Sequence, residues 1–173
     1  MYFFPILILF AVINHSANTD AVNANEDEFL ITFSMGGEMD MYQDGDHYGR
    51  KMTINFDGSL IIYDRVYRHR NKNSFIEDTN IYSGTVSSKS LDSLTTFMQA
   101  SAFSELPSRL PAVDPREVDI REPAENIEIT FQPTPDDEPH SVRAHMGADR
   151  RHYPEQFLEI NRHLRSLMRA RLE

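Results

Sequence analysis

Residues 52–63 have the sequence MTINFDGSLIIY, and this stretch decides the fold class. Apolar and polar residues alternate from Met52 to Phe56, which is the pattern of a strand with one buried face. Asp57 and Gly58 follow, a pair that favours the positive φ angles of a tight hairpin turn. The apolar residues after the turn predict a return strand, so we expect two antiparallel strands joined by a hairpin.

The same alternation predicts further strands on both sides of this hairpin. One begins at Phe29 and ends at Gly36-Gly37, which we interpret as a tight turn because glycine adopts turn conformations without steric cost. The polar residues 65–73 either form a loop or extend the hairpin. Three more strands are expected, and the acidic turn Pro133–Pro139 joins the last two; they lie at residues 81–86, 127–131 and 142–146.

Two segments have apolar residues at helical spacing. In the first, Ser87 or Ser88 is expected to cap a helix that Pro107 prevents from continuing. In the second, Pro154 suits the first turn of a helix that continues to the C-terminus. The apolar stripes of the two helices consist of Leu91, Leu94, Met98 and Ala102, and of Phe157, Ile160, Leu164, Leu167 and Met168.

Strands linked by hairpins and two amphipathic helices together define the fold class. Hairpins pair strands antiparallel, and helices with one apolar face need a surface to cover. We therefore predict an α+β fold, with an antiparallel sheet of five or six strands and two helices packed on one face. The hydrophobic content of 40% and the charged content of 25% are typical of a folded domain.

The N-terminus has the features of an export signal. Residues 3–13 form an uncharged apolar run, shorter than the roughly 20 residues that a bilayer-spanning helix needs. The small residues before Asn25 predict cleavage after Ala24, with cleavage after Ala17, an uncleaved anchor or a buried strand as alternatives. We thus expect a signal peptide, residues 1–24, and a single domain, residues 25–173. This domain is predicted to be secreted or periplasmic, without stable membrane insertion after cleavage.

Composition excludes several classes of function. The chain has no cysteine, which excludes disulfide-stapled mini-proteins, zinc ribbons and thiol enzymes. Its net charge of -10 argues against nucleic-acid binding, which needs a basic surface. The motifs of phosphate loops, dinucleotide sites, zinc proteases and serine hydrolases do not occur, so we predict no cofactor and no catalytic residue.

Two groups of side chains have the chemistry of metal ligands. Asp40, Asp44 and Asp46 surround a glycine, but an EF-hand register that starts at Asp40 would place Lys51 at its last ligand position. The second group consists of three histidines whose spacings match no usual zinc site: His140, His145 and His152. We therefore predict no metal site and interpret the aspartates as a solvated acidic loop.

Acidic residues are concentrated in two parts of the chain. Residues 25–46 contain seven acids and no Lys or Arg, and residues 114–138 contain nine acids with two arginines. Basic residues cluster instead at 65–72 and in the last helix. Such surfaces keep an exported protein soluble, and acidic loops can also steer a basic or metal-bearing partner toward one edge of the sheet.

The order of turns, strands and helices is marked by four segments: ITFSMGG at 31–37, YSGTVS at 82–87, AFSELP at 102–107 and IEITF at 127–131. In this order they resemble the emfourin family of small bacterial protease inhibitors, over residues 29–170. The resemblance implies a domain that inhibits protealysin or another thermolysin-like metalloprotease. The chain departs from the family pattern by its export signal and by longer segments at 38–50, 65–80 and 133–139.

These patterns together predict a function in protein binding. The expected partner-binding residues form the glycine turn and the acidic loop after it: Gly36, Gly37, Glu38, Asp40, Asp44 and Asp46. A carboxylate there could approach the catalytic metal of a protease or its cationic surroundings. We expect an exported, non-catalytic domain that binds another protein, with a secreted protease as the specific candidate. Two alternatives stay open: an extracellular or periplasmic domain of unknown partner, and a hydrolase that uses carboxylates or a histidine cluster.

Overall fold

The computed structural model describes residues 29–38, 47–71, 74–110, 125–146 and 153–172. These residues form a six-stranded antiparallel sheet and two α-helices, so the chain has the predicted α+β fold. The predicted signal peptide lies outside the described residues. Within the described part of the chain, no helix combines the length and the apolar character needed to cross a bilayer.

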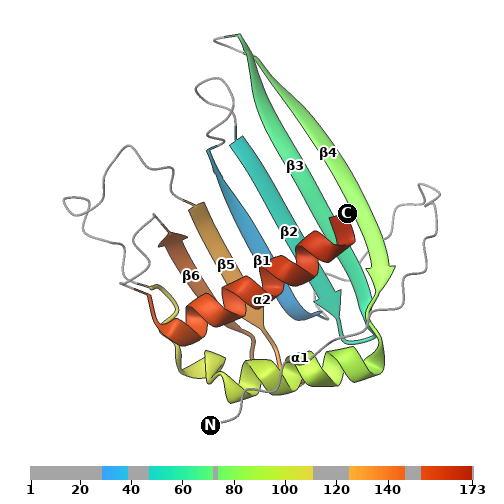
Figure 1. Cartoon of the computed structure of the whole chain (residues 1–173), viewed down its shortest axis with the longest axis vertical. Helices are drawn as coiled ribbons and strands as arrows, with labels where there is room; N and C mark the ends of the chain where they lie inside the picture. The colour runs from blue at the N-terminus through green and yellow to red at the C-terminus, as the bar shows by residue number, and fades with distance from the viewer. Residues whose placement is uncertain (1–28, 39–46, 72–73, 111–124, 147–152, 173) are drawn as a thin grey trace.

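The strands follow the order β4-β3-β2-β1-β5-β6 across the sheet, and every neighbouring pair is antiparallel (Figure 1). Their bounds are β1, Phe29–Glu38; β2, His47–Asn55; β3, Ser59–Asn71; β4, Ser74–Thr85; β5, Glu125–Phe131; and β6, His140–Met146. The helices are α1, Ser88–Ala100, and α2, Glu155–Leu172, with a short 3-10 helix η1, Phe103–Glu105. After α1 the chain returns to place β5 beside β1.

The hairpin between β2 and β3 forms where the sequence predicts it. Gly58 has a φ of 85°, and its N–H donates to the carbonyl of Asn55 at 3.0 Å. The Ser59 N–H donates to Oδ1 of Asp57 at 2.7 Å, and this bond lowers the pKa of the Asp57 carboxyl. A side chain at position 58 would be strained, because only glycine readily adopts this left-handed conformation.

The first strand does not end at the two glycines, so their prediction as a tight turn is wrong. β1 continues to Glu38, and Gly36 and Gly37 are extended residues paired with β2 on one side and β5 on the other. A Cβ atom on Gly36 would lie 2.9 Å from the Tyr48 carbonyl oxygen. Glycine is present here because the backbone of β2 approaches closely, and no turn is involved.

The sequence left two alternatives for the polar residues 65–73, a loop or an extension of the hairpin, and the structure contains the extended hairpin. β3 pairs with β4 from Ser59 opposite Thr85 to Asn71 opposite Ser74. The last strand before α1 therefore begins seven residues earlier than position 81. Consecutive polar residues from Glu77 to Asn80 conceal this extension, because they interrupt the alternation of apolar and polar residues that indicates a strand.

Helix α1 begins at the predicted cap and ends earlier than predicted. The Ser87 side chain accepts a hydrogen bond from the Ser90 N–H, so Ser87 is the cap. The helix ends at Ala100, and Ala102 has a left-handed φ of 50° and initiates η1. Placing Ala102 on the apolar stripe was therefore wrong, because the chain turns before it and buries Phe103 instead.

One hydrophobic cluster contains buried side chains from the sheet and from both helices. Figure 1 shows α2 crossing the strands diagonally, with α1 near the end of the sheet where β4 leads into it. The largest fully buried side chains include Phe33 of β1, Met98 of α1 and Phe157 of α2. Burial of such a side chain contributes roughly 1.5–3 kcal/mol, which makes this cluster the main source of stability.

Candidate functional site

Alternate residues of five strands direct their side chains away from the hydrophobic cluster and form what we call the polar face of the sheet. Tyr63, Lys51, Ser34, Glu128 and Arg143 are successive cross-strand partners from β3 to β6 and form one row of this face. The next row consists of Arg65, Gly49, Gly36, Asn126 and His145. The period of two in a strand explains why hydrophobic and polar residues separate in this way.

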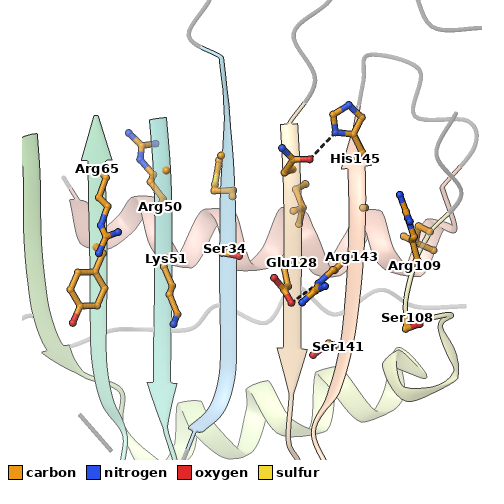
Figure 2. A pocket seen from close by; sticks show the side chains of 18 residues that line it. Ser34, Arg50, Lys51, Arg65, Ser108, Arg109, Glu128, Ser141, Arg143 and His145 are labelled. Carbon is orange, nitrogen blue, oxygen red and sulfur yellow. Dashed lines mark hydrogen bonds and ion pairs between the residues drawn. The ribbon is translucent and has the colours of Figure 1, made fainter. Parts of the chain in front are cut away.

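A pocket of about 1080 Å³ lies on the polar face (Figure 2). Its floor is built from both rows, and the segment from Ser108 to Leu110 contributes its rim beside β6. This segment is held by the Arg143 backbone: the Arg143 N–H donates to Ser108 O and the Leu110 N–H donates to Arg143 O, both at 2.9 Å. The rim is thus fixed by backbone bonds rather than by side chains alone.

Most of the charged residues that line the pocket are basic. Its charged members are Glu128, which is acidic, and the basic residues Arg50, Lys51, Arg65, Arg109 and Arg143. Of these, Arg50 forms an ion pair with Asp64, its cross-strand partner on β3, with 2.7 Å between Nε and Oδ1. Glu128 forms an ion pair with Arg143, with 2.8 Å between Oε1 and Nε (Figure 2). Because the Arg143 side chain is 71% exposed, this pair contributes little to stability. The pocket is therefore a positive region on a chain whose net charge is -10.

The histidines of the described chain do not converge. His145 lies on the polar face, where its Nδ1 is 2.8 Å from Oδ1 of Asn126 (Figure 2). His140 lies on the other side of β6, with Nε2 2.9 Å from the Leu106 carbonyl and its ring against Phe103. His152 lies outside the described residues. Among the residues that are described, no group of three His, Asp or Glu side chains could hold a metal ion.

A second polar cluster lies on the core side of the sheet, beside the middle of α2. Tyr48 donates its hydroxyl hydrogen to Glu125, and the Arg165 guanidinium donates to the other oxygen of that carboxylate. Arg165 also donates to Oδ1 of Asn161 at 2.9 Å. Burial, followed by the bond to Glu125, raises the pKa of Tyr48 well above its ordinary value, so this phenol stays protonated. The cluster connects β2, β5 and α2.

The predicted partner-binding residues fall partly within the described structure. Gly36 lines the pocket, and Gly37 and Glu38 complete β1 beyond it. Asp40, Asp44 and Asp46 lie outside the described residues, as does the first part of the second acidic stretch, residues 114–124. Of the described residues of the predicted site, Gly36 therefore lies in the pocket on the polar face.

The sequence contained one signal for the pocket, namely the polar residues at alternate strand positions. Ser34, Glu128 and Arg143 occupy such positions, but nothing local shows that they are neighbours. Ser34 and Glu128 are 94 positions apart in the sequence, and only the register of β1 and β5 brings them together. The sequence does not reveal the basic lining, because each strand contributes only one or two basic residues to it.

Comparison with models of known protein families and with curated proteins finds no match.

Proposed function

We propose that this chain is an exported, non-catalytic domain that binds another protein through the polar face of its sheet, with both helices packed on the opposite face. The observation that carries this proposal is the pocket, whose basic side chains come from three strands and from the segment Ser108–Leu110. Support for the helix arrangement comes from the hydrophobic cluster, in which buried residues of α1 and α2 join the core-facing residues of the strands.

The size and the chemistry of the pocket suit a segment of a protein partner. Its 1080 Å³ is at or above the usual range for small-ligand pockets, roughly 300–1,000 Å³. Guanidinium and ammonium groups donate charge-assisted hydrogen bonds, and the hydroxyls of Ser34 and Ser141 in the lining add neutral donors. An acidic surface segment presents the acceptors that these groups need.

A narrower form of the proposal is inhibition of a thermolysin-like metalloprotease. It rests on the resemblance to emfourins, whose first matching segment ends at Gly36-Gly37. Gly36 lines the pocket, and in the sequence residues 39–46 connect β1 to β2. Under this proposal the acidic residues of that connection, Asp40, Asp44 and Asp46, contact the protease beside the polar face.

Charge reversal on the polar face tests the general proposal. The partner is captured by the wild-type protein from the exported fraction of its own cells, and its affinity is then measured for Lys51→Glu/Arg109→Glu. Both side chains are exposed, so the fold should tolerate the change. We expect affinity to fall about tenfold or more. The control is Lys89→Glu, an exposed position on α1, which should bind as the wild type does. Equal affinity of all three proteins would reject the polar face as the binding surface.

A protease assay tests the narrower form. The purified protein is titrated against a panel of thermolysin-like proteases at micromolar excess, beside a variant with Asp40, Asp44 and Asp46 changed to Lys. Inhibition by the wild type that the variant lacks would support the acidic contact. Absence of inhibition across the panel would remove the inhibitor assignment and leave the binding proposal to the first experiment.

A further inference from the structure

The basic residues that line the pocket differ in how their charges are used. Three of them interact with other side chains of the chain: Arg50 with Asp64, Arg143 with Glu128, and Arg65 with the ring of Tyr63. The other two are Lys51 and Arg109, and both are exposed. Within the described part of the chain, neither of them forms an ion pair. These two cations are therefore available to a ligand.

Lys51 and Arg109 lie at opposite ends of one row on the polar face (Figure 2). Arg109 forms a parallel bridge with Arg143, and this bridge extends the row of cross-strand partners that begins at Lys51 on β2. The steps along the row are from β2 to β1, to β5, to β6 and to the segment Ser108–Leu110. Neighbouring strands lie about 4.8 Å apart, so the two ends of the row are roughly 19 Å apart.

The surface between the two cations is low and has little net charge. Glu128 and Arg143 neutralise one another there, and Ser34 has a short side chain. In the next row Gly36 lies opposite Gly49, so two neighbouring strands present no side chain at that point. A ligand can therefore lie across the strands, with its negative charges favoured at its two ends rather than in its middle.

An extended peptide has the length that this spacing requires. A strand rises about 3.3 Å per residue, so roughly 19 Å corresponds to about six residues. Side chains alternate between the two sides of a strand, so residues i and i+6 point to the same side and can both face the pocket. Acidic side chains at these two positions would each reach one cation and accept charge-assisted hydrogen bonds from it.

We propose that the pocket recognises an extended segment of the partner with two acidic residues six positions apart, one bound by Lys51 and the other by Arg109. The residues between them are uncharged, because an acidic residue in the middle would lie above Glu128 and be repelled. The hydroxyls of Ser34 and Ser141 can bond to polar groups of the middle. This inference rests on the proposed function, since it specifies which segment of a protein partner the polar face binds.

Two synthetic peptides of identical composition and charge test the spacing. Blocked ETSTSTE has its glutamates six positions apart, and blocked TSETEST has them two apart. Their affinities for the protein, expressed from its full-length sequence, are measured by calorimetry in about 0.1 M salt, where screening beyond about 10 Å keeps one carboxylate from acting on both cations. We expect ETSTSTE to bind about tenfold more tightly or better. Equal affinities, or inorganic phosphate binding as tightly as ETSTSTE, would overturn the proposal.

Charge reversal on the protein tests which side chains bind the two acids. Lys51→Glu and Arg109→Glu should each weaken the binding of ETSTSTE about tenfold or more, and each should prefer blocked KTSTSTE, which has a lysine at one end. Both positions are exposed, and an unchanged circular dichroism spectrum verifies the fold. The control Lys89→Glu, an exposed change on α1, should bind as the wild type does. Unchanged affinity of both variants for ETSTSTE would show that these cations do not bind the acids.

The outcome can be separated from that of the proposed function, which is tested by the binding of Lys51→Glu/Arg109→Glu to the captured partner. Loss of the partner by this double variant, together with equal affinities of the two peptides, would overturn the spacing and leave the proposed function intact. An unaffected partner, together with a clear preference for ETSTSTE, would overturn the proposed function and retain the pocket as a site for acidic peptides.

Discussion

Tyr48 on β2 donates its hydroxyl hydrogen to Glu125 on β5, although β1 lies between these two strands. The β1 residue opposite both of them is Gly37. Because glycine has no side chain, the phenol and the carboxylate can meet above it. The position that sequence analysis assigned to a turn thus allows a contact between strands that are not neighbours, and Arg165 extends this contact to α2.

Removal of this hydroxyl should destabilise the fold measurably. For Tyr48→Phe we expect a loss of about 1–2 kcal/mol in the free energy of unfolding, because a hydrogen bond to a half-buried carboxylate is lost. Urea denaturation of Tyr48→Phe, Glu125→Gln and the double variant gives the coupling energy. Tyr63→Phe, which leaves this cluster intact, is the control. A coupling energy near zero would contradict the contact.

Two glycine-to-alanine changes in the sheet should differ in their effect on stability. In Gly36→Ala the new Cβ would lie 2.9 Å from the Tyr48 carbonyl oxygen, so the strands must shift, and we expect a loss of about 1–3 kcal/mol. In Gly84→Ala the nearest atoms are at 3.9 and 4.0 Å, so stability should change by no more than about 0.5 kcal/mol. Thermal unfolding at low protein concentration measures both. Equal effects would show that close strand approach does not explain Gly36.

Stability should depend on the protonation of His163. Burial lowers the pKa of His163, with a smaller opposing effect from Glu159, and its ring lies 4.7 Å from that of Phe97. Between its folded and unfolded pKa values the unfolded chain binds more protons, so this contribution to stability is complete above about pH 6.5 and is lost as the pH falls.

The variant His163→Gln cannot gain this proton. Its free energy of unfolding should therefore decline less steeply from pH 7 to pH 5 than that of the wild type, as measured by urea denaturation at each pH. Arg162→Gln, an exposed change on the same helix, should keep the wild-type slope. Parallel profiles for His163→Gln and the wild type would contradict the effect of burial on this imidazole.

Gln132 should stabilise the acidic turn between β5 and β6. This side chain is buried, and its Nε2 donates to the carbonyls of Pro135 at 3.1 Å and Asp137 at 2.9 Å. For Gln132→Ala we expect a loss of about 1 kcal/mol and faster amide hydrogen exchange of Asp137. Thr134→Ala, which removes an exposed hydroxyl, should have a smaller effect. Unchanged exchange in Gln132→Ala would mean that the turn is held by its backbone alone.

Local patterns predicted those elements whose cause is local. The turn at Gly58 needs a left-handed φ, the cap at Ser87 needs a side-chain acceptor, and the alternation in β2 and β5 needs only one buried face. The same reasoning was wrong for Gly36-Gly37. The sequence does not distinguish a glycine that avoids a clash with a neighbouring strand from a glycine in a turn.

The sequence by itself therefore determined the α+β class, the hairpin between β2 and β3 and, apart from Ala102, the apolar residues of both helices, since each depends on residues within a few positions of one another. Only the tertiary structure decided that Ser34, Glu128 and Arg143 form one row, that Tyr48 meets Glu125, and that β4 is an edge. These relations depend on the register between strands distant in the sequence. That register is set by how the whole core packs, and no single segment contains it.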